Sequence, residues 1–172
     1  GLNDSNVFQL AEAFNDERFA LDSYRRLIQM YSNVVLGVEH ERFEAVLANK
    51  KRMDNVVSDA DFNVDQLNWI INAYKNTVER FTDSLFPQDP YEQLTGAIEA
   101  VFNSWQNKRA VIYRKINNIP DSWGTGATIQ SMVFGNLNDK SGTGVAFTRN
   151  PSNGDKELYG EYLINAQGED VV

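Results

Sequence analysis

The 172-residue chain contains no cysteine, which excludes disulfides and thiolate metal sites as sources of its stability or chemistry. The absence of cysteine fits a reducing compartment, and we expect the cytoplasm. Basic residues are scarce as well, since 16 lysines and arginines stand against 24 aspartates and glutamates, for a formal net charge of −8. A nucleic-acid-binding surface needs a basic excess that neutralises phosphates. Nucleic acid is therefore excluded as a class of partner.

Long apolar runs are also missing. No stretch approaches the roughly 18 consecutive apolar residues of a membrane span, and the first residues lack the basic and apolar regions of a signal peptide. We therefore expect no membrane partner. The chain begins with Gly1 and ends in GEDVV, neither of which is typical of a natural terminus. We expect a fragment of a longer protein.

What the sequence does contain changes in kind along its length. Up to about residue 118 the apolar residues recur at helical spacing, whereas from about 127 they gather in short β-branched and aromatic runs between glycines. This predicts an α+β chain, with a helical subdomain over residues 1–88 and a helix plus antiparallel sheet over 89–172. The boundary follows Pro87, which disfavours helix in the residue before it, and a new helix begins with Asp89 as cap and Pro90 in first position.

Three helices are predicted within residues 15–85. The first, DERFALDSYRRLIQMYSNVVL, begins with Asp16, a favourable N-cap residue. EHERFEAVLANKKRM forms the second helix, and the third begins at Asn63, which pairs with Gln66 in a capping box. In the first of them, Asp22, Arg25 and Arg26 lie off the apolar stripe. We expect these three charged residues on a solvated face, paired at i,i+3 or i,i+4.

The helix that begins at Asp89 carries its own apolar stripe, and helical character is predicted to continue through RAVIYRKINN. We expect the three tryptophans to pack in the core. The stripe consists of Leu94, Ile98, Val101, Phe102 and Trp105, and the tryptophans are Trp69, Trp105 and Trp123.

Three runs after Trp123 predict strands: ATIQSMVFG, GVAFT and ELYGEYLIN. The last has apolar residues on both faces, as in a sheet covered on both sides. The links between these runs are rich in turn-forming residues. Residues 151–154 fit a type I turn, closed by a glycine that can adopt a positive φ.

The glycine-rich stretch SGTGVAFTRNPSNG, residues 141–154, has two interpretations. A phosphate-binding loop needs several backbone N–H groups that converge on one anion, usually at a helix N-terminus and often followed by lysine. Here a strand follows instead, and a Gly-Lys-Ser/Thr ending is missing. The local pattern favours a hairpin, with the phosphate loop as the alternative.

Few residues are candidates for chemistry. The single histidine, His40, stands at a helix start without a second histidine, so we expect a surface or capping residue. The carboxylates Glu157, Glu161, Glu169 and Asp170 are of the type that binds magnesium, but ordinary strand positions are the favoured interpretation. The residues therefore predict neither a catalytic group nor a metal ligand within this chain.

One stretch suits a nucleotide base. Adenine recognition needs an exposed strand edge with a backbone N–H and C=O, apolar side chains against the ring, and a polar side chain for the exocyclic amine. TIQSMVFGN contains these elements in Gln130, Met132 and Val133. These three residues are the candidate base-binding residues.

Longer motifs make the interpretation specific. DSYRRLIQMYSNVV, FPQDPYEQL, AIEAVFNSWQNKRAVIYRKINNIPDSWGTGATIQSMVFGN and SGTGVAFTRNPSNGDKELYGEYLINAQGEDVV resemble the N-terminal nucleotide-binding region of the pyruvate, phosphate dikinases. The resemblance covers essentially the whole chain. It implies part of an ATP-grasp domain in an enzyme that converts ATP, pyruvate and phosphate to AMP, phosphoenolpyruvate and diphosphate, through a phosphohistidine on another domain. The related phosphoenolpyruvate synthases lack the TRNP and NAQGEDVV motifs, so the resemblance favours the dikinases.

The resemblance places TIQSMV at the adenine-side strand. It implies that Gln130 contacts the base through its side chain, and Met132 and Val133 through their backbone. One departure is Lys108, which replaces a proline of the family pattern, so we expect a softened kink there.

The resemblance also implies what this piece lacks. The family's phosphate-binding Lys and Arg motifs precede residue 1, and its magnesium-binding strands follow residue 172. ATP and Mg²⁺ are thus cofactors of the parent enzyme, and we expect neither to bind this fragment tightly. Pyruvate and phosphate would bind other domains, which would also form a homodimer. The alternative from another class is a helical interaction module that kept the fold and performs no chemistry.

Overall fold

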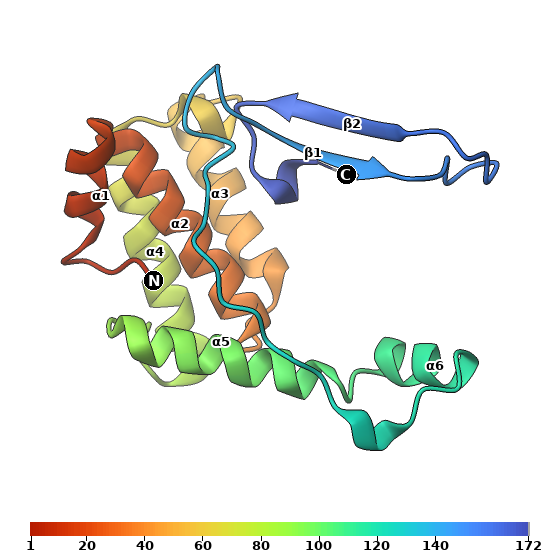
Figure 1. Cartoon of the computed structure of the whole chain (residues 1–172). Helices are drawn as coiled ribbons and strands as arrows, with labels where there is room; N and C mark the ends of the chain where they lie inside the picture. Colours follow the sequence, from red (N-terminus) through yellow and green to blue (C-terminus); the bar gives the residue numbers. More distant parts are fainter. Residues whose placement is uncertain (172) are drawn as a thin grey trace. The chain divides into compact units, whose positions relative to one another are not determined.

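The computed structural model describes residues 1–171 and confirms an α+β chain. By its internal contacts the chain divides into two compact units, Gly1–Thr128 and Ile129–Val172, which are described separately. The first unit is helical and the second contains a β-hairpin (Figure 1). The boundary predicted between residues 88 and 89 stays a prediction. None of the helices in the described residues combines the length and hydropathy needed to cross a membrane.

Six α-helices and two short 3-10 helices make up the described part of the first unit. Their bounds are α1 (Val7–Phe14), α2 (Glu17–Val34), α3 (His40–Asp54), η1 (Asp59–Asp61), α4 (Val64–Thr82), α5 (Pro90–Ser104), α6 (Lys108–Ile116) and η2 (Asp121–Trp123).

The predicted helix starts are confirmed by their capping bonds. The Asp16 carboxylate accepts an N–H of the first turn of α2. Asn63 and Gln66 form a reciprocal capping box at α4, with both N···O distances 2.9 Å. Asp89 caps α5, whose first residue is Pro90. Such caps satisfy N–H groups that the first turn of a helix leaves without a partner.

The core of the first unit lies around α2, which packs against α1, α3 and α4. Phe43 of α3 and Tyr74 of α4 meet edge to face, with ring centroids 5.0 Å apart. Full burial of one large apolar side chain contributes about 1.5–3 kcal/mol, so these contacts dominate the stability of the unit. The largest fully buried side chains are Tyr24, Ile28, Phe43, Phe62, Leu67, Ile70, Tyr74 and Val78.

The expectation of a solvated face at Asp22 and Arg25 is wrong. Asp22 is 5 % exposed and Arg25 is 2 % exposed, because several helices enclose the first half of α2 and cover the face that periodicity assigns to solvent. The two form a buried ion pair, with Arg25 Nη2 2.7 Å from Asp22 Oδ1. Burial on its own would raise the pKa of Asp22, but Arg25 and Arg26 outweigh it, and its pKa lies below the usual value.

The helical character predicted after α5 continues as a separate helix. Residues 105–107 interrupt it, and Asn107 has an extended backbone with ψ of 141°. The softened kink expected at Lys108 is thus wrong, because the chain breaks and restarts there. Beyond the break, the Arg114 guanidinium lies 4.0 Å from the Trp105 ring centroid, and its Nε donates to Asp121 Oδ1 at 2.7 Å. These contacts of Arg114 with Trp105 and Asp121, called the Arg114 clasp below, connect α6 to the turn that follows it.

The apolar stripe predicted on α5 exists, but among the described residues much of it faces solvent. The expected core packing of the tryptophans is also wrong for Trp69 and Trp123, which are exposed. Against α2, α5 presents small residues instead. A Cβ added to Gly96 would lie 2.3 Å from Tyr31 Oη, so glycine permits this close approach.

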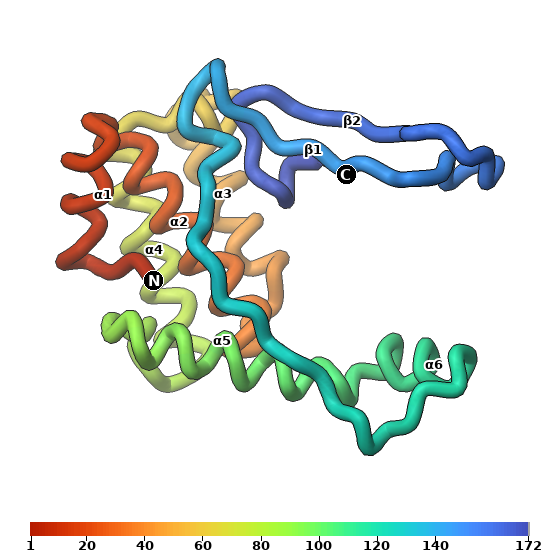
Figure 2. Tube along the Cα trace, viewed as in Figure 1, coloured from red at the N-terminus to blue at the C-terminus, as the bar shows by residue number. Residues whose placement is uncertain are grey.

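The second unit is built on one antiparallel hairpin. Strand β1 (Gly142–Phe147) pairs with β2 (Tyr159–Ile164), in a register that runs from Gly142 opposite Ile164 to Phe147 opposite Tyr159. A short 3-10 helix, η3 (Gly168–Asp170), follows. The two later strand predictions are confirmed, but the expectation of a sheet covered on both faces is wrong for the described residues, because every residue of β2 is exposed. The strand predicted over residues 127–135 is wrong, because none of the described residues pairs with it in a ladder and it stays extended without secondary structure (Figure 2).

Candidate functional site

The glycine-rich stretch forms strand β1 and the turn that follows it. A Cβ on Gly142 would lie 2.8 Å from the Leu163 carbonyl oxygen, and one on Gly144 would lie 2.9 Å from that of Glu161. These glycines therefore allow the two backbones to approach closely, which is a known use of glycine inside strands. The prediction of a hairpin is confirmed.

The turn between the strands is braced by its own side chains. Arg149 Nη1 donates to the Gly154 carbonyl at 3.1 Å, and Asn150 Nδ2 donates to Glu157 Oε1 at 3.1 Å. Gly154 has a φ of +82°, as predicted for the residue that closes the turn. Its N–H bonds to the Asn150 carbonyl, so the closure spans one residue more than a type I turn.

The candidate base-binding residues lie on the segment that precedes the hairpin. All three are exposed, Met132 by 64 % and Val133 by 87 %. Within the described residues, neither the side chain of Gln130 nor the backbone N–H groups of Met132 and Val133 make a hydrogen bond. The segment therefore offers apolar side chains and polar backbone groups together. Their contact with a base stays a prediction.

A junction that the sequence analysis missed ties this segment to the hairpin. Gly135 is buried, and its carbonyl accepts the N–H of Ala166 at 3.0 Å. Thr143 Oγ1 donates to the Ala166 carbonyl at 2.6 Å, and the Asn165 N–H bonds to the Ser141 carbonyl at 2.8 Å. The structure thus joins the end of the candidate segment to Ala166, just after β2, and Ala166 is in turn bonded to Thr143 of β1. The glycine in MVFGN was the only signal in the sequence.

The candidate carboxylates are not brought together. Glu161 lies on β2, Glu157 is bonded to the hairpin turn, and Asp170 accepts the Gln167 N–H at 2.8 Å at the start of η3. Residues 1–171 contain no cluster of three or more metal-ligating side chains. The residues present do not fit a magnesium centre. His40 is a surface residue, as expected, with its Nε2 3.4 Å from Glu44 Oε1.

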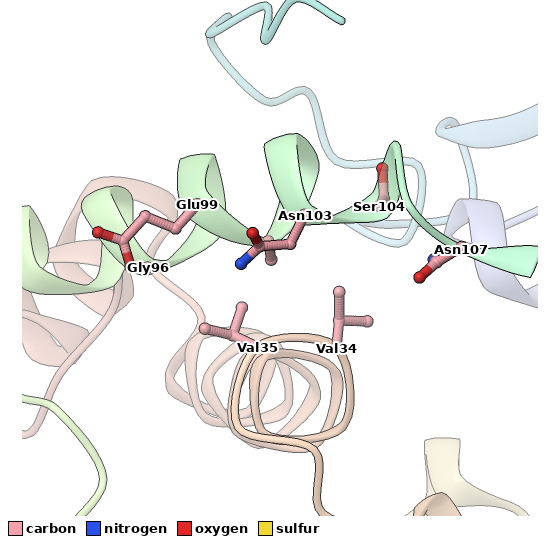
Figure 3. Close-up of a pocket in the computed structure, with 8 residues that line it drawn as sticks. Val34, Val35, Gly96, Glu99, Asn103, Ser104 and Asn107 are labelled. Carbon is pink, nitrogen blue, oxygen red and sulfur yellow. The ribbon is translucent and has the colours of Figure 1, made fainter. Parts of the chain in front are cut away.

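The helical unit contains a separate cavity of about 270 Å³ between α2 and α5. Figure 3 shows Val34, the last residue of α2, and the following Val35 pointing toward the α5 stretch that contains Gly96 and Asn103. Its wall is polar on the α5 side and apolar on the α2 side. Glu99 and Ser104 line it together with asparagines and small residues, and no histidine does.

The described residues thus comprise a helical unit and, in a separate unit, a glycine-rich hairpin with an exposed segment bonded next to it. Sequence comparison identifies the family of the chain. Residues 42–172 match the family described as "Pyruvate phosphate dikinase, AMP/ATP-binding domain", and the chain belongs to that family.

Relatives in distant organisms match the chain over its whole length. It is 55% identical over 172 residues to the pyruvate, phosphate dikinase of Rhizobium meliloti and 52% identical over 173 residues to that of Clostridium symbiosum. It is also 52% identical to a chloroplastic pyruvate, phosphate dikinase of Mesembryanthemum crystallinum. These alignments cover 100% of this chain and 19%, 20% and 18% of the relatives, so the chain spans about a fifth of their length.

Proposed function

We propose that this chain is part of the ATP-binding domain of a pyruvate, phosphate dikinase. The parent enzyme would move a phosphoryl group from ATP to a histidine on another domain and then to pyruvate, and its products would be AMP, phosphoenolpyruvate and diphosphate. The observation that carries this proposal is the identity of 50% or more to several dikinases across the whole chain. It favours a dikinase over a phosphoenolpyruvate synthase or a non-catalytic helical module.

In this proposal the chain contributes the base side of the ATP site and a helical cap. Gln130 would accept or donate a hydrogen bond at the adenine edge through its amide, and Met132 and Val133 would offer backbone N–H and C=O groups. Their exposure supports this role, as does the lack of competing hydrogen bonds to the Met132 and Val133 amides. Apolar side chains beside a few convergent polar groups are typical of small-molecule sites.

The phosphate side of the site would lie outside this chain. Phosphoryl transfer depends on positioned cations and Mg²⁺ that neutralise charge on the phosphates, and residues 1–171 hold no metal cluster. Mg²⁺, pyruvate and inorganic phosphate would therefore bind through other parts of the parent enzyme, which would also supply the homodimer interface. We also propose a cytoplasmic location, with which the lack of cysteine in this part of the chain is consistent.

Calorimetric titration with MgATP tests this division of labour. With only the base side present, we expect binding too weak to measure at micromolar concentrations of the 172-residue chain. The full-length parent enzyme, titrated as the control, should bind MgATP. Tight binding and turnover by the 172-residue chain would contradict the assignment of the phosphate side to other segments.

A further inference from the structure

Gly135 has the most restricted surroundings of the segment that leads into the hairpin. A Cβ at this position would lie 2.1 Å from Thr143 Oγ1, 2.2 Å from the Ala166 carbonyl oxygen and 3.0 Å from the Gly142 carbonyl oxygen. Two of these three atoms belong to the backbone and cannot rotate away. Any side chain at residue 135 must therefore move the segment away from the hairpin.

The contrast with the residues before it is large. Residues 124–134 form neither a helix nor a strand, whereas the Gly135 carbonyl accepts the N–H of Ala166 at 3.0 Å. Val133 is only two residues from Gly135, and consecutive Cα atoms are about 3.8 Å apart. A displacement at residue 135 thus reaches the Met132 and Val133 amides with little to absorb it.

We propose that Gly135 is a positioning residue for nucleotide binding, which fixes the base-binding amides of residues 132 and 133 relative to the β1–β2 hairpin. This inference rests on the proposed function. Gly135 itself touches no nucleotide in this account. It acts because its missing side chain lets three stretches of backbone, at residues 135, 142 and 166, meet at one point.

The test is the substitution Gly135→Ala in the full-length parent enzyme, with Gly126→Ala in the same enzyme as the matched control. A Cβ on Gly126 meets nothing within 4 Å, and its φ lies outside the left-handed region, so this substitution should be silent. For Gly135→Ala we expect the KM for ATP to rise about tenfold or more, with kcat within about threefold of the wild type. A lower kcat with unchanged KM would mean loss of active enzyme only, and would overturn the positioning role.

Hydrogen exchange with adenosine gives a second readout that does not depend on turnover. Adenosine carries no phosphate, so it reports the base side alone. We expect adenosine to protect the amides of residues 132 and 133 in the wild type and in Gly126→Ala, and to protect them much less in Gly135→Ala. Equal protection in all three proteins would refute the role of Gly135 while leaving the proposed base contacts intact.

The same experiment separates failure of the inference from failure of the proposed function. If adenosine binds the wild type without protecting residues 130–133, the proposed base contacts are wrong, and the positioning role falls with them. If Gly135→Ala does not fold, Thr143→Ala provides a milder perturbation, because it removes the bond to the Ala166 carbonyl without adding atoms near it. It should reduce adenosine protection at residues 132 and 133, and unchanged protection would contradict the junction's role.

Discussion

Replacement of Asp22 by asparagine tests whether the buried ion pair of α2 holds the helical unit together. Asp22→Asn keeps the side-chain shape but removes the charge that lies 2.7 Å from Arg25 Nη2, in a site where both residues are almost fully buried. Breaking a buried pair by removing one partner typically lowers the free energy of unfolding by about 3–5 kcal/mol. We expect a loss of about 3 kcal/mol, the lower end of this range. The asparagine oxygen can still accept a hydrogen bond from Arg25, and Asp59 Oδ2 lies 3.6 Å from Arg25 Nη2 and supplies a second negative charge.

Urea denaturation followed by far-UV circular dichroism measures this loss. With a denaturant slope of about 2 kcal/mol per molar, the unfolding midpoint should fall by about 1.5 M. The matched control is Glu39→Gln, which removes the exposed partner of Arg42 and should change stability by less than about 1 kcal/mol. A shift for Asp22→Asn as small as that of the control would refute the account of the buried pair.

The pH dependence gives the same prediction a second test. The pKa of Asp22 is lowered in the folded chain, so its contribution is present above the unfolded carboxyl pKa and is lost as the pH falls through the folded value. The free energy of unfolding should therefore drop below about pH 4 in the wild type. This part of the drop should be missing in Asp22→Asn, and an identical acid profile would contradict the assignment.

Three further substitutions test individual contacts of the helical unit. Asn63→Ala removes the capping box of α4 and should destabilise the chain by about 1 kcal/mol in urea denaturation, whereas no measurable change would show that the cap is dispensable. Gly96→Ala forces a methyl group toward Tyr31 Oη, and the clash, less the gain of about 1 kcal/mol from alanine's helix propensity, should leave a net cost of about 1 kcal/mol, while Gly168→Ala, with open space around it, should cost less. Arg114→Ala removes the cation over Trp105 and its bond to Asp121, so limited proteolysis within residues 105–123 should speed up, and an unchanged cleavage rate would contradict the clasp.

Local chemistry was enough to predict the helix starts but not what surrounds the helices. The caps at Asp16, Asn63 and Asp89 depend on residues one to three positions away, which the sequence displays directly. The burial of Asp22 and Arg25 depends on three other helices that pack around α2, which periodicity within one helix cannot show. The sequence also predicts the apolar stripe on α5. It does not show that, among the described residues, much of this stripe faces solvent.

The candidate site divides in the same way. The hairpin and its turn could be predicted because glycine, asparagine and proline specify backbone geometry locally. The strand over residues 127–135 could not, since a strand forms only where a partner provides its ladder, and the described residues provide none. The junction at Gly135 was missed because it depends on Ala166, which lies far along the chain and carries no recognisable motif.

The most direct test of the central claim is the ATP dependence of the full-length enzyme with Gln130 replaced by alanine. The assay measures AMP and diphosphate formed from ATP, pyruvate and phosphate. The account predicts that the wild type forms both products and that Gln130→Ala raises the KM for ATP about five- to tenfold, the effect of one lost hydrogen bond to the base. An unchanged KM, or no AMP and diphosphate from the wild type, would contradict it.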